Sequence, residues 1–289
     1  MRVAYFTAGT QGAGHLVRGL AIQRGLNRGG RAGGVARGAL DYRMFGPALP
    51  FSLAAQPGYV AVPIDQAELR DRTRAPLSVL ARALHDYAPE LLLVDCYWAP
   101  LRHLLPLRGC EAWLLARWLP PRWFGGPPEA RWAPGQFQRV LALEPFPIPG
   151  ETDRLPPIVI CNPDEARPPG SLRARLGLSP ERKLRVVTHA GVPGEAAQLA
   201  RASGADTFVF DLHQADALFP LAEWLGDADE ISSAAGYNSF WEARWMGTAS
   251  RTRFTVLERQ QPEQAWRLAA CANTTMTENG ADVLARMIA

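Results

Sequence analysis

Four residues near the start of the chain form a pattern that can bind an anion and move a proton. Gly9, Gly12, Gly14 and His15 follow a G-x-x-G-x-G-H spacing, directly after residues 2–6, which read as a short buried strand. Glycine lets the backbone come close to a ligand, and the amides at the start of a helix favour anions. A histidine in the first helical turn can accept a proton or bind a hydroxyl or phosphate. A structural tight turn with a capping or core-facing histidine would explain the same pattern, so both interpretations stay open.

The glycine spacing also bears on which ligand is expected. Dinucleotide-binding folds use G-x-G-x-x-G, with an acidic residue at the end of the second strand for the ribose. This chain has neither that spacing nor a clearly placed acidic residue. A nicotinamide-dependent oxidoreductase is therefore disfavoured.

A second candidate segment spans residues 227–243. A short strand there ends in small residues, Gly236 allows a tight turn, and Asn238 or Ser239 can cap the helix that follows. The backbone amides at this helix start can meet a diphosphate. Glu242, one turn into the helix, can reach a pair of ribose hydroxyls. The segment therefore predicts a site for a nucleoside diphosphate.

These two segments resemble those of GT-B glycosyltransferases. The similarity is strongest to the group around the UDP-N-acetylglucosamine transferase that forms lipid II in peptidoglycan synthesis, with related predicted glycosyltransferases. In that group a segment ending in G-x-x-(S/T)-x-x-E holds the diphosphate and ribose, and a G-x-x-G-x-G-H loop faces the interdomain cleft. The matching residues here are Ala228-Asp229, Ile231-Ser232, Gly236, Ser239 and Glu242 for the first motif, and Gly9, Gly12, Gly14 and His15 for the second.

The resemblance implies further donor contacts. A glycine loop opens the C-terminal half of such proteins, and Thr188–Gly191 through Gly194 and Glu195 match it, although Pro193 removes one backbone donor. A D-x-Q-like segment touches the donor sugar, and Pro262-Glu263-Gln264 is the match. The donor-binding residues that the resemblance implies are Gly191, Gly194, Glu195, Gly236, Tyr237, Asn238, Ser239, Glu242 and Gln264. His15 is then the candidate catalytic base.

Strands and helices alternate along the chain, which predicts an α/β fold. Expected strands are residues 2–6, a weak one around Val35, 59–64, 91–95, 112–116, 140–143, 184–188, 207–211, 230–232 and 253–257. Expected helices follow residue 14 and Gly236 and cover 77–86, 195–201, 218–225, 261–271 and 281–288. With the resemblance, we expect two Rossmann-like domains facing a cleft, over residues 1–160 and 161–289, with a trimmed C-terminal domain.

Two further features are compatible with ligand binding but do not require it. Asp95 ends the strand 91–95, where open α/β sheets place ligands, and we group it with Gly12, Ala13 and Gly14 as the expected acceptor side. A helix cap or turn former would explain Asp95 as well. Aromatic and cationic side chains that could dock a sugar or a membrane headgroup, or serve as core and loop, are Trp113, Arg117, Trp118, Arg122, Trp123, Arg131 and Trp132.

Composition excludes several classes. The net charge of +3, from 31 basic and 28 acidic residues, is too balanced to predict a nucleic-acid partner. The four cysteines are widely spaced, which favours reduced thiols over a zinc site or a disulfide scaffold. No secretion signal or membrane-spanning run is evident, so we expect a cytoplasmic protein, with contact at a membrane surface left open.

The combined expectation is a metal-independent, inverting glycosyltransferase without a cofactor. It would move a sugar from a nucleotide donor, expected to be UDP-linked, to a hydroxyl acceptor that is either lipid-linked or a small metabolite. Two alternatives stay open. A nucleotide-sugar epimerase or hydrolase on the same fold would consume donor without an acceptor. A non-catalytic nucleotide-sugar-binding protein would bind donor and turn nothing over.

Overall fold

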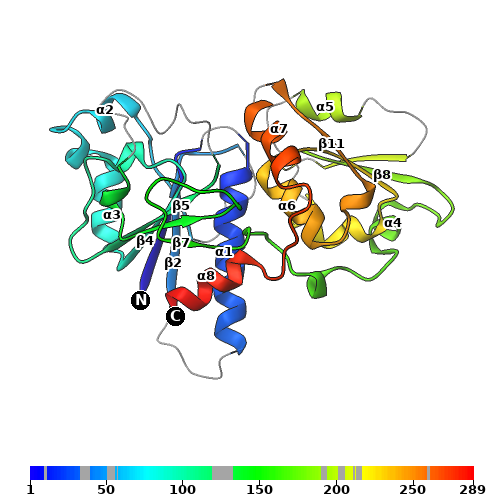
Figure 1. Ribbon diagram of the computed structural model, residues 1–289, viewed down its shortest axis with the longest axis horizontal. Helices are drawn as coiled ribbons and strands as arrows, with labels where there is room; N and C mark the ends of the chain where they lie inside the picture. Colours follow the sequence, from blue (N-terminus) through cyan, green and yellow to red (C-terminus); the bar gives the residue numbers. More distant parts are fainter. Residues whose placement is uncertain are drawn as a thin grey trace. The chain divides into compact units, whose positions relative to one another are not determined.

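The computed structural model contains two compact units, each of α/β type (Figure 1). One unit is Met1–Thr10 with Asn27–Leu155, and the other is Gln11–Leu26 with Pro156–Ala289. The residues that the structure describes are 1–9, 12–32, 40–50, 56, 58–118, 133–189, 194–200, 206–210, 212, 217–258 and 261–289.

The first unit is built on a parallel sheet with strand order β3-β2-β1-β4-β5-β6-β7. The strands are β1 Arg2–Phe6, β2 Asp41–Gly46, β3 Tyr59–Ala61, β4 Leu91–Asp95, β5 Glu111–Ala116, β6 Arg139–Ala142 and β7 Asp153–Arg154. All five residues of β4 are buried. Such an unbroken buried run is typical of a parallel strand covered on both faces.

Local capping determines where the helices of this unit begin and end. The helices are α2 Gln66–Arg70 and α3 Val79–Tyr87, with 3-10 turns at Ala75–Leu77, Ala99–Leu101 and Pro134–Gln136. The Ser78 hydroxyl accepts a hydrogen bond from the Ala81 amide and caps α3. The helix ends at Ala88, in the left-handed conformation, directly before a proline. Proline disfavours a helical residue in front of it, which explains this end.

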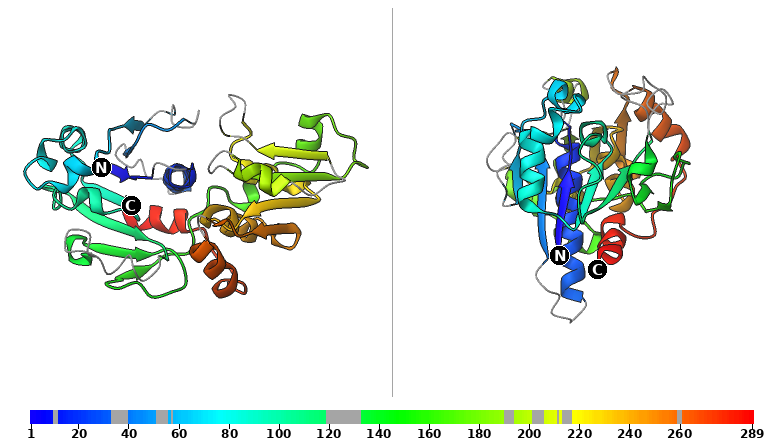
Figure 2. Two further views of the ribbon diagram at one scale, coloured as in Figure 1. Left: turned by 90° about the horizontal axis from the view of Figure 1, so that it is seen from above. Right: turned by 90° about the vertical axis from the view of Figure 1, so that its left-hand side faces the viewer.

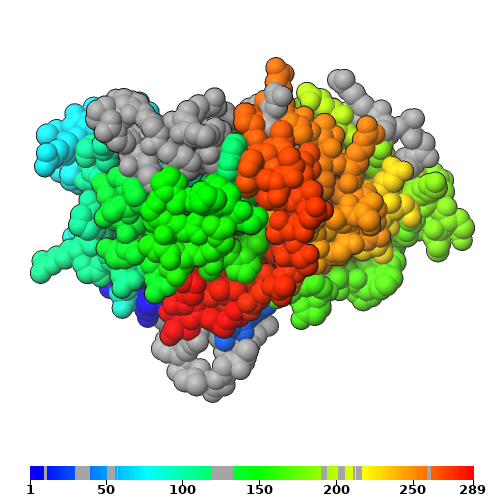
Figure 3. All heavy atoms as spheres, in the orientation of Figure 1, coloured from blue at the N-terminus to red at the C-terminus, as the bar shows by residue number. Residues whose placement is uncertain are grey.

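The second unit has a four-stranded parallel sheet among its described residues, in the order β11-β10-β8-β9. The strands are β8 Leu184–Thr188, β9 Asp206–Phe210, β10 Glu230–Ala234 and β11 Thr252–Thr255. The α-helices are α4 Ser171–Leu176, α5 Glu195–Ala200, α6 Tyr237–Trp245, α7 Gln261–Ala270 and α8 Gly280–Ile288, with 3-10 helices at Pro163–Glu165, Leu221–Asp227 and Ala249–Arg251. One side of α8, red in Figure 3, lies at the molecular surface, and the other is buried.

The helix α1, Gly14–Ala32, begins in the second unit. Its Arg24 guanidinium pairs with Glu223 at 2.8 Å and with Glu165 at 3.2 Å. Further along, α1 lies beside α8 at Gly25 and Ala281 (Figures 1 and 2). The first half of α1 is therefore tied to the second unit by charge and by close packing.

Gly25 gives a prediction about stability. A Cβ at this position would lie 2.5 Å from the carbonyl oxygen of Ala281. Gly25→Ala is expected to lower the free energy of unfolding by about 1–3 kcal/mol, because overpacking outweighs the gain in helix propensity. Gly226→Ala is the control, since no described atom lies within 4 Å of its Cβ. Urea unfolding measures both, and equal stabilities of the two variants would contradict the packing seen here.

Most expected elements are confirmed, with two exceptions. The expected strand around Val35 lies outside the described residues, and the strand next to β1 is β2, Asp41–Gly46, which was missed. The α-helix expected at 218–225 is a 3-10 helix at Leu221–Asp227. Pro220 explains why this helix begins later than expected, because the residue before a proline avoids the helical region.

None of the helices in the described part of the chain is long and apolar enough to cross a membrane.

Candidate functional site

The start of α6 is the centre of the candidate site. Gly236 occupies the N-cap position in an extended conformation, with φ −63° and ψ 158°, and as a glycine it has no side chain that could cap the helix. The expectation that Asn238 or Ser239 would cap it is therefore wrong, because they are the second and third residues of α6. The first amides of a helix have no partner within it, so a helix start without a capping side chain can receive an anion.

The glycine at position 236 is not explained by the fold itself. Its φ is one that any residue adopts, so the tight turn expected there does not require glycine. No described atom lies within 4 Å of the position that a Cβ would take. A ligand that approaches the backbone closely would account for the missing side chain.

Glu242 lies further along α6 and is half-buried. Burial raises the pKa of its carboxyl group from 4.5 to about 7. Among the described residues, none makes a hydrogen bond or ion pair with this carboxylate. A half-buried carboxyl group with a raised pKa and no partner among the described residues is a candidate for ligand binding.

Tyr237 and Asn238 have structural side chains. The Tyr237 ring is 4% exposed, its hydroxyl accepts a hydrogen bond from the Ile158 amide at 2.8 Å, and the Arg18 guanidinium lies 4.3 Å from the ring centroid. The Asn238 side-chain amide donates to the Gly14 carbonyl oxygen at 2.9 Å. Their backbone amides at the helix start remain the groups that could contact a donor.

The Asn238 hydrogen bond brings the first glycine loop to the start of α6, within the second unit. Gly12 has a φ of +71°, a conformation that favours glycine, and Ala13 is fully buried. Gly14 is exposed, and His15, the next residue, is half-buried in the first turn of α1. The candidate base and the candidate diphosphate amides therefore belong to one compact unit, although they are more than 200 residues apart in the sequence.

The loop after β8 is described only in part. Gly191 and Pro193 lie outside the described residues. Gly194 has a φ of +90°, which favours glycine, and Glu195 is the first residue of α5. The Glu195 carboxylate lies 2.6 Å from Nε2 of His189, the residue that directly follows β8.

Gln264 is placed in the core of the second unit. Its side chain is 1% exposed, and its Oε1 accepts a hydrogen bond from the Leu257 amide at 2.7 Å. This placement speaks against the contact with the donor sugar that the resemblance implied. A buried amide oxygen with a backbone partner is the ordinary arrangement for a structural glutamine.

Asp95 is also buried, in the first unit. It ends β4 with 0% exposure, the Tyr5 hydroxyl donates to its Oδ2, and the Cys96 thiol lies 3.4 Å from its Oδ1. A carboxylate enclosed in this way is not available to an acceptor in the structure. Nothing in the sequence marked Tyr5 as a partner of Asp95, because an aromatic residue in a buried strand is typical of a core residue.

The tryptophan-rich stretch can be followed only in part, because Trp123 and Trp132 lie outside the described residues. Trp113 is 5% exposed, with the Arg139 guanidinium 4.8 Å from the centroid of its ring. Trp118 is half-buried and packs edge-on against Phe146. Trp113 is thus a core residue, as one of the two interpretations expected.

Arg267 is a site residue that sequence reasoning missed. It is fully buried on α7, and its Nη1 donates to the carbonyl oxygen of Ala235 at 2.8 Å, directly before the N-cap glycine of α6. Its guanidinium also lies 5.8 Å from the Tyr237 ring centroid. The bond holds the turn between β10 and α6 in place. Almost all of the positive charge of the chain comes from arginine, so nothing in the sequence distinguished Arg267 from the other arginines.

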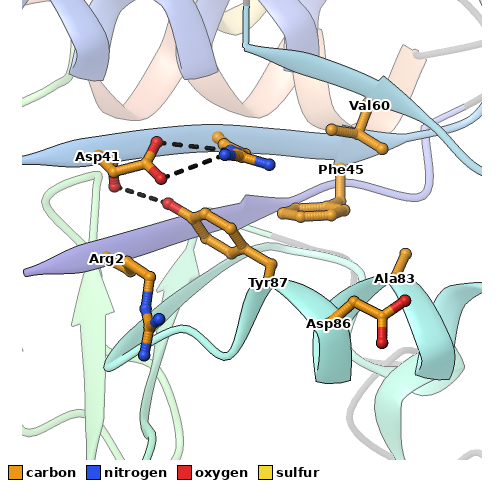
Figure 4. Close-up of a pocket in the computed structure, with 8 residues that line it drawn as sticks. Arg2, Asp41, Phe45, Val60, Ala83, Asp86 and Tyr87 are labelled. Atoms are coloured by element: carbon orange, nitrogen blue, oxygen red, sulfur yellow. Dashed lines mark hydrogen bonds and ion pairs between the residues drawn. The ribbon is translucent and has the colours of Figure 1, made fainter.

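A hollow of about 400 Å³ lies in the first unit, over β2, β3 and α3 (Figure 4). It is lined by charged residues at the amino ends of the strands, where Arg43 pairs with Asp41 and the Tyr87 hydroxyl donates to the Asp41 carbonyl oxygen. Parallel α/β sheets bind ligands at the opposite, carboxyl edge. Arg43 and Asp41 are paired with each other and the hollow lies away from that edge, so we do not assign it to the site.

No protein-family model matches the sequence, and no curated protein sequence matches it. Several solved structures, by contrast, match this chain. The spinosyn rhamnosyltransferase SpnG complexed with thymidine diphosphate is 15% identical, with a TM-score of 0.59 over 94% of this chain and 85% of that chain. The spinosyn forosaminyltransferase SpnP is 16% identical, with a TM-score of 0.55 over 100% and 98%. UGT2 of Phytolacca americana, complexed with UDP-2-fluoro-glucose and pterostilbene, is 13% identical, with a TM-score of 0.56 over 99% and 89%.

At these identities the likeness shows the fold. Each of the three structures is a match over nearly the whole of this chain, and the two units here are both α/β with parallel sheets. The chain therefore has a Rossmann-like fold of the GT-B type, the fold that it shares with these glycosyltransferases.

Proposed function

We propose that the protein is a glycosyltransferase that moves a sugar from a pyrimidine nucleotide donor to a hydroxyl group. The observation that carries the proposal is the start of α6. A nine-residue helix, an N-cap glycine that the fold does not require, and a Glu242 carboxylate with no hydrogen-bond or ion-pair partner among the described residues lie within one short segment. The amides would bind the diphosphate and the carboxylate would accept hydrogen bonds from the ribose hydroxyls.

Support for the donor class comes from the structures that share the fold. SpnG is complexed with thymidine diphosphate, and UGT2 with UDP-2-fluoro-glucose. A UDP- or TDP-linked sugar is therefore the first donor to test. The narrower likeness to the lipid II transferase group rests on the sequence motifs alone.

The same structures suggest an acceptor class. SpnG has been seen with spinosyn aglycone, and UGT2 with pterostilbene, both of which are organic molecules and not lipid-linked sugars. We infer that the acceptor is a hydroxyl of a small organic molecule. A lipid-linked acceptor, and with it contact at a membrane surface, is the alternative to test second.

The chemistry would be a single displacement with inversion. His15 would take the proton of the acceptor hydroxyl, whose oxygen attacks the anomeric carbon of the sugar. The bond from that carbon to the diphosphate oxygen breaks, and the nucleoside diphosphate leaves with its electron pair. Preorganised amides at the α6 start would stabilise the charge that develops on the diphosphate, so that no bound metal is required.

A panel of nucleotides tests the proposal. The melting temperature is measured with UDP, TDP, GDP, UDP-sugars and NADPH. A ligand at about a hundred times its dissociation constant stabilises a protein by roughly 2.7 kcal/mol, which is a readable shift. We expect a shift with UDP or TDP, followed by sugar transfer to a phenolic or alcoholic acceptor. Stabilisation by NADPH alone, or by no nucleotide, would contradict the proposal, whereas binding without turnover would support the non-catalytic alternative.

A further inference from the structure

A histidine–glutamate pair lies beside the proposed donor site, and the mechanism proposed above does not use it. Nε2 of His189 and Oε2 of Glu195 are 2.6 Å apart, and the two side chains are only 10% and 13% exposed. A contact this short between two largely buried side chains indicates a fixed part of the structure, because two exposed charged groups rarely hold one geometry.

The sheet places this pair next to the start of α6. Strands β8 and β10 are parallel neighbours, with Thr188 opposite Ser233, and the Ser233 hydroxyl donates to the Thr188 carbonyl oxygen at 3.3 Å. His189 directly follows Thr188, and the turn to α6 directly follows β10. Both therefore emerge from the carboxyl edge of adjacent strands, which in parallel sheets lie about 4.8 Å apart. This is the edge at which such sheets bind ligands.

The paired side chains are better suited to bind an anion than either side chain would be alone. A lone carboxylate beside a diphosphate would repel it, so Glu195 is a poor direct contact for a donor. Held 2.6 Å from the imidazole, the same carboxylate accepts a hydrogen bond from the ring and fixes its orientation. An imidazolium has two N–H donors, and only one of them is used by Glu195. No hydrogen bond from the other nitrogen to a described residue is present.

We propose that His189, held by Glu195, contacts the diphosphate of the donor and offsets its negative charge as it leaves. His189 is then a catalytic residue on the leaving-group side, and Glu195 is a positioning residue. A charge-assisted hydrogen bond of this kind strengthens as charge builds on the phosphate oxygen. The inference rests on the proposed function, because it needs a nucleoside diphosphate at the start of α6.

The test separates the diphosphate from the rest of the nucleotide. Dissociation constants are measured for UDP by calorimetry and for uridine by competition against UDP, in the wild type, His189→Ala, Glu195→Gln and the exposed control His85→Ala. We expect His189→Ala to weaken UDP on the order of tenfold or more while uridine changes less than about twofold. Glu195→Gln should weaken UDP by less than His189→Ala does, and His85→Ala should match the wild type.

A second variant guards against misfolding. His189→Gln keeps a donor for Glu195 but carries no charge, so the same selective loss of UDP affinity is expected. Equal losses for UDP and uridine would show a structural role and overturn the inference, as would unchanged UDP affinity in both His189 variants. If the wild type binds neither UDP nor TDP, the proposed function fails and this inference falls with it.

Discussion

Glutamine in place of Glu242 is expected to weaken UDP binding by roughly tenfold to a hundredfold, because a hydrogen bond to a charged acceptor contributes about 1.5–3 kcal/mol. Glutamine keeps the shape of the side chain and one acceptor oxygen, and removes only the charge. Glu181→Gln is a matched control, since Glu181 is an exposed carboxylate in the same unit. Calorimetric titration of both variants with UDP measures the effect. A Glu242→Gln protein that binds UDP as the wild type does would exclude a ribose contact at this position.

The raised pKa of Glu242 gives this prediction a pH signature. The ionised carboxylate is the better acceptor, and with a pKa of about 7 it is lost as the pH falls below that value. The advantage of the wild type over Glu242→Gln in UDP affinity should therefore shrink as the pH falls from about 8 to about 6. Comparing the two proteins at each pH cancels the titration of the histidines, which both share.

The same variant should gain stability when no nucleotide is bound. The carboxyl pKa is about 7 in the folded protein against 4.5 as its ordinary value, so the folded state binds the extra proton between these values. Stability of the wild type therefore falls as the pH rises through this window. Above it, Glu242→Gln should be more stable by about 1–2 kcal/mol, a figure reduced for partial exposure, and near pH 4.5 the difference should vanish. A less stable variant at high pH would show that the carboxylate is paired in the folded protein.

Alanine in place of His15 is expected to lower the rate of sugar transfer by about a hundredfold to ten-thousandfold, which is the usual contribution of a general base. UDP affinity should change less than about twofold, because the proposed donor contacts lie on α6 and at His189 and not at His15. The rate is measured with saturating donor and the acceptor found in the transfer assay, and His85→Ala serves as the control. A parallel fall in rate and in UDP affinity would place His15 in donor binding and not in proton transfer.

The sequence predicted the elements whose signals are local and strong. Strand β4 is an unbroken apolar run, and the start of α6 follows a run of small residues. Both were found where they were expected. Strand β2 was missed because Asp41 and Arg43 interrupt its apolar residues, and a strand near an exposed edge tolerates such charges.

The roles of several residues depend on tertiary contacts that the sequence alone does not reveal. Nothing in the sequence related Gly25 to Ala281, and only their close approach shows why a glycine lies inside α1. Asn238 read as a helix cap, but its side chain bonds to Gly14, a residue that no local pattern relates to it. Gln264 and Arg267 are both buried on α7, and only the structure shows that each bonds to the backbone of another element.

Hydrogen–deuterium exchange with and without UDP tests the central claim most directly, because it locates the ligand without any variant. The account predicts that UDP slows exchange in peptides covering Gly236–Glu242, with a smaller effect at Gly12–His15. Binding of UDP that leaves the exchange of Gly236–Glu242 unchanged, and protects another part of the chain such as the hollow in Figure 4, would contradict it.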